Sequence, residues 1–140
     1  MIKLKEILLE STVPNIFIPR RMENRLDKYI RLYIKNGSKG TLNLQHSNLT
    51  VLPEMLKDIT VDGSFYCGNN HLTTLENCPK TVNGVFGCSS NKLISLEGAP
   101  KFVGEDFMCR FNPGKFTEKD IRAVCDVLGS IFLWLNLKIY

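Results

Sequence analysis

Five cysteines are the residues with the most versatile chemistry in this 140-residue chain, because a thiol can bind a metal, attack a substrate or form a disulfide. A zinc site needs four ligands at the corners of a tetrahedron, usually supplied by C-x-x-C pairs, and no such pair occurs here. Cys67, Cys88 and Cys109 instead recur every 21 residues. We therefore expect structural thiols, with no metal site and no cofactor.

The histidines and carboxylates give little support for catalysis. His46 and His71 have no acidic or nucleophilic partner recurring beside them, and the sequence holds no phosphate-binding glycine loop and no nucleophile elbow. Glu76 and Glu97 occupy equivalent positions 21 residues apart, which favours two solvated turns over a paired-carboxylate active site. The sequence thus predicts no catalytic residues and a protein that is not an enzyme.

Composition predicts one globular domain over residues 1–140. Hydrophobic residues make up 44% of the chain and charged residues 23%, which is enough apolar side chain to build a core. No stretch without Lys, Arg, Asp or Glu is longer than the fourteen residues 40–53, and the apolar stretch 127–137 has eleven, whereas a membrane-spanning helix needs about twenty. The opening sequence MIKLKEILLE is too charged for a secretory signal. We expect a cytoplasmic protein without a membrane partner.

An internal repeat with a period of 21 residues organises the middle of the chain. GSFYCGNNHLTTLE at residues 63–76 aligns with GVFGCSSNKLISLE at residues 84–97. A third copy opens at Phe107, and an earlier copy opens at Leu42, offset by 23 residues, with its two additional residues in segment 53–59. The shared frame is Φ-x-Φ-x-x-N-x-L-x-x-L, in which Φ is Leu, Phe or Cys.

Each part of this frame has a mechanical role. The alternation Φ-x-Φ predicts a short strand that points two side chains into a core and one to solvent. A buried Asn after the strand can bond backbone groups of the neighbouring coil that would otherwise lack partners. Because one coil cannot bury its own apolar face, successive coils must stack.

The frame is similar to that of leucine-rich-repeat proteins of the short 20–23-residue class. The longer pattern V-x-G-x-F-x-C-x-x-N-x-L-x-x-L-E-x-x-P-K, at Val61–Lys80 and again at Val82–Lys101, resembles small leucine-rich-repeat proteins encoded by tailed bacteriophages. The resemblance covers about residues 40–128. It implies an α/β fold, a short solenoid of about four coils with a parallel sheet. It also implies a non-enzymatic interaction protein in the cytoplasm of an infected cell, which binds and inhibits a host defence or regulatory protein.

Segments 1–39 and 113–140 are expected to close the two ends of the repeats at 40–112. A helix is predicted over Arg20–Asn36, preceded by a shorter one over Ile2–Leu9. A second long helix is expected to begin at a capping box, Thr117–Asp120, and to continue through Leu128. Strict alternation then predicts a strand over residues 131–139, lying beside strand 107–109.

The exposed positions of the strands are where a partner is expected to dock. Aromatic, Met and Arg residues, which are enriched at binding hot spots, gather there. The candidate partner-binding residues are Asn43, Gln45, Tyr66, Met108, Arg110, Phe132 and Trp134. Phe132 and Trp134 could instead be covered by the N-terminal segment or by a second copy of the chain, so a homo-oligomer through the C-terminal strand is an alternative.

A nucleic-acid-binding regulator is the alternative function. Residues 1–39 carry a net charge of +5, whereas residues 40–140 carry −1. Tyr29 and Tyr33 fall on the apolar side of the predicted helix and Asp27 dilutes the positive field, so a solvated helix face or an acidic protein partner also accounts for the charge. The residues that would contact phosphates are Arg21, Arg25, Lys28, Arg31 and Lys35.

Overall fold

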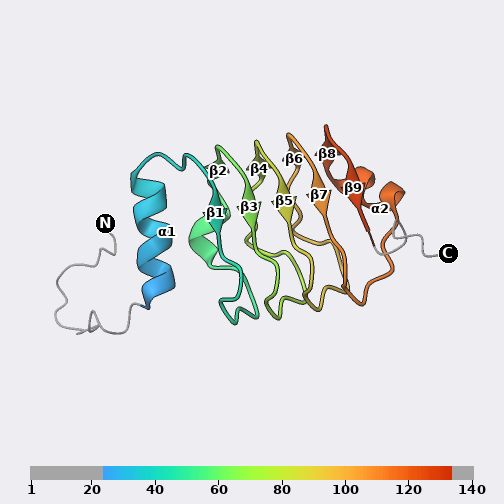
Figure 1. Cartoon of the computed structure of the whole chain (residues 1–140), viewed down its shortest axis with the longest axis horizontal. Coiled ribbons are helices and arrows are strands. Elements are labelled where there is room, and N and C mark those ends of the chain that lie inside the picture. Colours follow the sequence, from blue (N-terminus) through green and yellow to red (C-terminus); the bar gives the residue numbers. More distant parts are fainter. Residues whose placement is uncertain (1–23, 134–140) are drawn as a thin grey trace.

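The structure is a computed structural model, and it describes residues 24–133. Two α-helices, one short 3₁₀ helix and nine two-residue strands follow one another along the chain (Figure 1). In chain order they are α1 (Arg25–Lys35), β1 (Leu42–Asn43), η2 (Glu54–Leu56), β2 (Thr60–Val61), β3 (Phe65–Tyr66), β4 (Thr81–Val82), β5 (Phe86–Gly87), β6 (Phe102–Val103), β7 (Phe107–Met108), α2 (Glu118–Val124), β8 (Asp126–Val127) and β9 (Ile131–Phe132).

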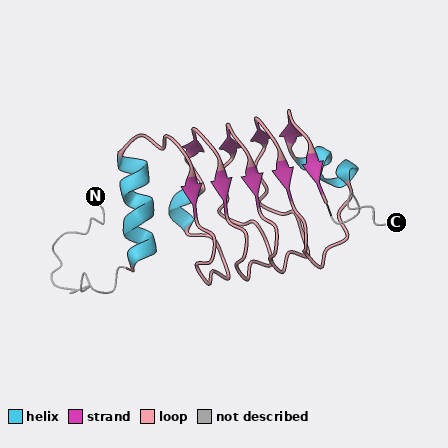
Figure 2. Ribbon diagram, viewed as in Figure 1, coloured by secondary structure: helices cyan, strands magenta, loops and turns pink. Residues whose placement is uncertain are grey.

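The strands form two parallel sheets, so the chain is an α/β protein. One sheet has five strands in the order β1-β3-β5-β7-β9, and the other has four in the order β2-β4-β6-β8 (Figure 2). From β1 to β8 the chain alternates between the two sheets, and β9 adds the fifth strand to the first sheet, an arrangement compatible with a repeat solenoid. The sequence predicted a single sheet and missed the second, because β2, β4, β6 and β8 lie outside the alternating Φ-x-Φ segments of the repeat.

Register between neighbouring strands follows the sequence repeat. Phe65 lies opposite Phe86, and Phe86 lies opposite Phe107, in the five-stranded sheet. At the first coil Leu42 pairs with Phe65, two residues further away, and the 3₁₀ helix η2 occupies the segment to which the sequence assigned the additional residues. Equivalent residues therefore lie side by side on adjacent strands.

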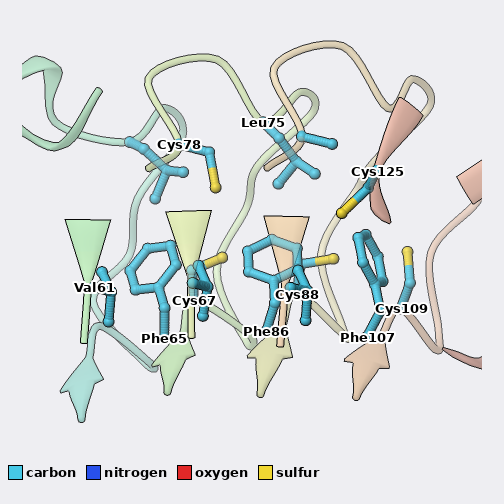
Figure 3. Packing of buried hydrophobic residues seen from close by; sticks show 14 of the residues in the cluster. Val61, Phe65, Cys67, Leu75, Cys78, Phe86, Cys88, Phe107, Cys109 and Cys125 are labelled. Atoms are coloured by element: carbon cyan, nitrogen blue, oxygen red, sulfur yellow. The ribbon is translucent and has the colours of Figure 1, made fainter. Parts of the chain in front are cut away.

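The core is built from columns of equivalent side chains between the two sheets. The rings of Phe65 and Phe86 have centroids 5.9 Å apart, and those of Phe86 and Phe107 are 4.9 Å apart (Figure 3). All three rings are fully buried, as are Cys67 and Cys88 of the neighbouring column. The expected stacking of the phenylalanines is confirmed, and it fixes which side chains are left on the outside.

A ladder of buried asparagines, Asn70, Asn91 and Asn112, joins one coil to the next. The Nδ2 of Asn70 donates to the carbonyl of Leu44 at 2.9 Å, while its Oδ1 accepts from the backbone N of Leu49 at 2.9 Å. Asn112 repeats this pattern with the preceding coil. The asparagines thus satisfy buried backbone groups in the bends, as the sequence predicted.

The helix α1 lies at one end of the stacked strands (Figure 1). Its Ile30 is buried, and the hydroxyl of Tyr33 donates to the carbonyls of Ser38 and Gly40 at 2.8 and 2.9 Å. The helix begins at Arg25. The prediction that it extends back to Arg20 is wrong at Asn24, which is not helical. Asn24 is extended and caps the helix by accepting from the backbone N of Asp27. The shorter helix predicted over residues 2–9 lies outside the described residues.

The helix α2 lies at the other end and is shorter than predicted. Its capping box between Thr117 and Asp120 is confirmed. The helix ends at Val124, because the next residues form β8, which pairs with β6 in the four-stranded sheet. Leu128, expected on the apolar side of the helix, is 70% exposed instead. Pairing in the second sheet overrides the helical spacing of the apolar residues.

The strand β9 pairs with β7 as predicted, with Ile131 opposite Phe107. Ile131 and Leu133 are buried, whereas Phe132 between them is half-buried on the outer side. The remainder of the predicted strand, from Trp134 onward, lies outside the described residues.

Candidate functional site

The outer face of the five-stranded sheet carries two rows of side chains, which we call the docking face. The strand register aligns one residue from each strand into the first row: Asn43, Tyr66, Gly87, Met108 and Phe132. The residues two positions further along the first four strands form the second row: Gln45, Gly68, Ser89 and Arg110. Regular spacing in the sequence thus becomes a surface of adjacent, chemically different side chains.

An aromatic ring covers the middle of the first row. Gly87 is buried although it faces outward, because the ring of Tyr66 leans over it. A Cβ at position 87 would lie only 2.9 Å from the Cδ1 of Tyr66. The absence of a side chain at position 87 therefore leaves room for the ring of Tyr66 over β5, and Met108 follows on β7, the next strand. The result is an apolar platform of Tyr66 and Met108.

Arg110 lies at the C-terminal end of the docking face. Its backbone N donates to the Oγ of Ser89 at 2.9 Å, and its Cζ lies 5.3 Å from the centroid of the Phe132 ring. This distance is within the range of a cation–π interaction. The Nε of Arg110 is buried and finds no hydrogen-bond acceptor within residues 24–133. Over that range, the contact that positions the guanidinium is with an aromatic ring and not with a carboxylate.

A hollow of about 410 Å³ adjoins Arg110 and Phe132. Its other walls include Glu118 and Arg122 of α2 and Ser130. The Nε of Arg122 pairs with the Oε2 of Glu118 at 3.0 Å. The sequence did not predict this hollow. The spacing of four residues between Glu118 and Arg122 on the predicted helix is the signal that could have indicated the ion pair in its wall.

Six of the seven candidate partner-binding residues lie on the docking face. Asn43 and Gln45 are exposed at its β1 edge, Tyr66 is half-buried on β3, the next strand, and Met108, Arg110 and Phe132 are half-buried toward the β9 edge. Trp134, the seventh, lies outside the described residues. The structure thus brings the six residues onto one surface, although their role in binding stays a prediction.

The basic residues of the alternative site follow α1. Arg25, Lys28, Arg31 and Lys35 are all exposed, whereas Arg21 lies outside the described residues. Tyr29, on the same helix, contacts the first strand: its hydroxyl accepts a hydrogen bond from the backbone N of Asn43 in β1 at 3.2 Å.

The thiols lie in the core, away from solvent. Burial raises the pKa of Cys67, of Cys78 and of Cys88, and it raises the pKa of Cys125 to about 11. A thiol with a raised pKa stays protonated at neutral pH and is a poor nucleophile and a poor metal ligand. Within residues 24–133, no group of three or more His, Cys, Asp or Glu side chains could hold a metal ion.

The remaining polar candidates for chemistry are dispersed. His46 and His71 are exposed, as are Glu76 and Glu97 at their equivalent turns. Over the part of the chain that the structure describes, no helix has the length and apolar character needed to cross a bilayer. In comparisons with known proteins, the chain matches no family model, no curated protein and no solved structure.

Proposed function

We propose that the chain is a short leucine-rich-repeat protein of the bacteriophage type, with α1 and the α2–β9 segment as caps, which binds a host protein through its docking face and inhibits it. The observation that carries this proposal is the row in which Tyr66, Gly87, Met108 and Phe132 follow one another across one sheet, with the Tyr66 ring against Gly87. Large half-buried apolar and aromatic side chains on an open face are the residue types that dominate binding energy in protein interfaces.

The geometry supports binding rather than catalysis. The platform of Tyr66 over Gly87 presents an aromatic ring, and the polar groups of the docking face lie around it, with Asn43 and Gln45 at one edge and Arg110 toward the other. An apolar centre with a polar rim is the usual anatomy of a protein–protein interface. Inhibition would follow from steric occupation of the partner's own working surface.

Capture from a lysate of the bacterial host, followed by mass spectrometry, tests this function. We expect wild-type protein to retain a specific host protein and the double variant Tyr66→Ala, Arg110→Ala to lose it. The matched control is Lys80→Ala, Lys101→Ala, which changes two exposed residues that precede strands of the other sheet. Equal capture by the wild type and the docking-face variant, at equal thermal stability, would refute the assignment of this face.

The nucleic-acid alternative rests on α1, where Arg25, Lys28 and Lys35 are exposed and form no ion pair with any residue in the range 24–133. It predicts a mobility shift with DNA or RNA at low salt that weakens steeply as salt rises, because phosphate binding releases counterions. The variant Arg25→Ala, Lys28→Ala should abolish the shift. Absence of a shift at low salt with the wild-type protein would remove this function.

A further inference from the structure

Arg110 is a cation for which the described part of the chain supplies no anionic partner. Its backbone is held by Ser89, but among residues 24–133 its guanidinium forms no ion pair and donates no hydrogen bond. Its buried Nε–H has no acceptor on any residue between Asn24 and Leu133. A buried donor without an acceptor costs stability, so folding by itself does not account for an arginine here.

Arg122, which lines the same hollow, shows what a structural arginine looks like in this protein. Its Nε pairs with the Oε2 of Glu118 at 3.0 Å, and its Nη1 donates to the carbonyl of Val127 at 2.9 Å. Arg122 therefore holds β8, the strand that follows α2, against the helix. Arg110 makes no contact of this kind, although it lies on the same wall.

The acidic groups near the hollow are already engaged. The Oε2 of Glu118 accepts from Arg122, and the Oδ1 of Asp106, the residue before β7, accepts from the backbone N of Ser130 at 2.8 Å. Neither is hydrogen-bonded to Arg110. The positive charge of Arg110 is thus available to a group that arrives from outside.

Phe132 orients this charge. The ring lies 5.3 Å from the Cζ of Arg110 and leaves the edges of the planar guanidinium to carry its N–H donors. Two parallel N–H donors match the two oxygens of a carboxylate, and the hollow of about 410 Å³ beside them has room for a side chain. Charge complementarity and shape both favour a carboxylate on an acidic residue.

We propose that the hollow between Arg110, Phe132 and α2 is a subsite for an Asp or Glu side chain of the partner protein, with Arg110 as the residue that recognises it. This inference rests on the proposed function, because it assumes that the partner lies across the docking face. The apolar platform of Tyr66 and Met108 then contacts the neighbouring residues of the partner, and Arg110 sets which residue type is accepted at that end.

Selection from a random displayed peptide library tests the subsite without knowledge of the partner. The baits are the full-length wild type, Arg110→Glu and the control Lys80→Glu, which reverses one exposed charge outside the docking face. We expect the wild-type and Lys80→Glu pools to be enriched in Asp and Glu over the unselected library, and the Arg110→Glu pool to turn to Lys and Arg. An acidic enrichment that Arg110→Glu leaves unchanged, or a wild-type pool with none, would overturn the proposal.

Affinity measurements on one selected acidic peptide then test the geometry. Replacing its selected carboxylate with the amide should weaken binding to the wild type by about tenfold or more, and should change little in binding to Arg110→Gln. Arg110→Lys keeps the charge but loses the fork of donors, so it should give an intermediate affinity. Equal affinity of all three proteins for the peptide, with unchanged circular dichroism, would overturn the subsite.

The outcomes separate this subsite from the broader function. Peptides that require Tyr66 but not Arg110 would refute the carboxylate subsite and leave the docking face in place. Peptides that require neither residue would refute both. A single-stranded oligonucleotide that binds through Arg110 where acidic peptides do not would identify phosphate as the ligand and would also overturn the proposal.

Discussion

The two faces of the five-stranded sheet are built on the same backbone but follow opposite rules. On the inner face, Phe65, Phe86 and Phe107 repeat one residue type. On the outer face, the adjacent positions hold Tyr66, Gly87 and Met108, which share neither size nor chemistry. Each inner residue has the same neighbours above and below, so packing selects the same side chain again. Packing does not select one residue type at the outer positions, so different side chains can occur there and can contact a partner.

The largest effect should follow from breaking the inner ladder at Asn91. The Asn91 side chain donates to the carbonyls of Cys67 and Cys88 at 3.0 and 3.1 Å and accepts from the backbone N of Leu72 at 3.0 Å. Asn91→Ala leaves these buried groups without partners and should lower the free energy of unfolding by about 3 kcal/mol or more. Urea unfolding measures this loss, and Lys92→Ala, at the exposed neighbour, is the control.

A loss below about 1 kcal/mol in Asn91→Ala would mean that water replaces the amide in the bend. The inner face would then be held by its apolar columns alone, and the contrast between the faces would rest on packing rather than on hydrogen bonds.

A smaller loss in the free energy of unfolding should come from ionisation of the buried thiols at high pH. Burial raises the pKa of Cys88 above its ordinary value of 9.0, so the folded protein keeps a proton that the unfolded chain loses. The stability contributed by this thiol is therefore lost as pH rises above the unfolded value, by about 1.4 kcal/mol per pH unit. Urea unfolding at pH values on either side of 9.0 should show a shallower decline for Cys88→Ala than for the wild type.

The outer-face control for the thiol experiment is Ser89→Ala, the next residue along the chain, which has no titrating group. Its stability should fall with pH in parallel with that of the wild type. Parallel curves for all three proteins would show that the Cys88 thiol ionises as readily in the folded state as in the unfolded state.

The smallest change in stability should come from the outer face at Gly87. Gly87→Ala places a methyl group against the ring of Tyr66, which lies at the surface and can swing outward. The free energy of unfolding should change by less than about 1 kcal/mol, while the aromatic resonances of Tyr66 shift and capture of the partner weakens. A loss of about 2 kcal/mol or more would instead mean that the docking face is packed as tightly as the core.

The sequence predicted the inner face well because its signal is local and repeated. The spacing of Phe65, Phe86 and Phe107 predicted their column, and a buried Asn after each strand predicted the hydrogen bonds that Asn70 and Asn91 make. The positions that point outward on β3 and β7 followed from the same alternation.

The features that the sequence did not predict all depend on contacts between distant segments. The second sheet and the early end of α2 at Val124 arise from pairing between β6 and β8, and the pairing residues Asp126 and Val127 carry no strand pattern of their own. The hollow beside Arg110 needs Glu118 and Arg122 from a different element. The tilt of the Tyr66 ring over Gly87 depends on space left on the next strand.

The equal offset of 21 residues between the coils of Phe65, Phe86 and Phe107 has a consequence for how such a protein changes over generations. Each asparagine contacts the coil before it in the same way. Recombination between two equivalent codons would remove or duplicate residues 84–104 as one unit, and the contacts between the coils on either side would be of the same kind as before. Gain or loss of a whole coil would therefore resize the recognition surface in one genetic event, and the outer residues could diverge afterwards.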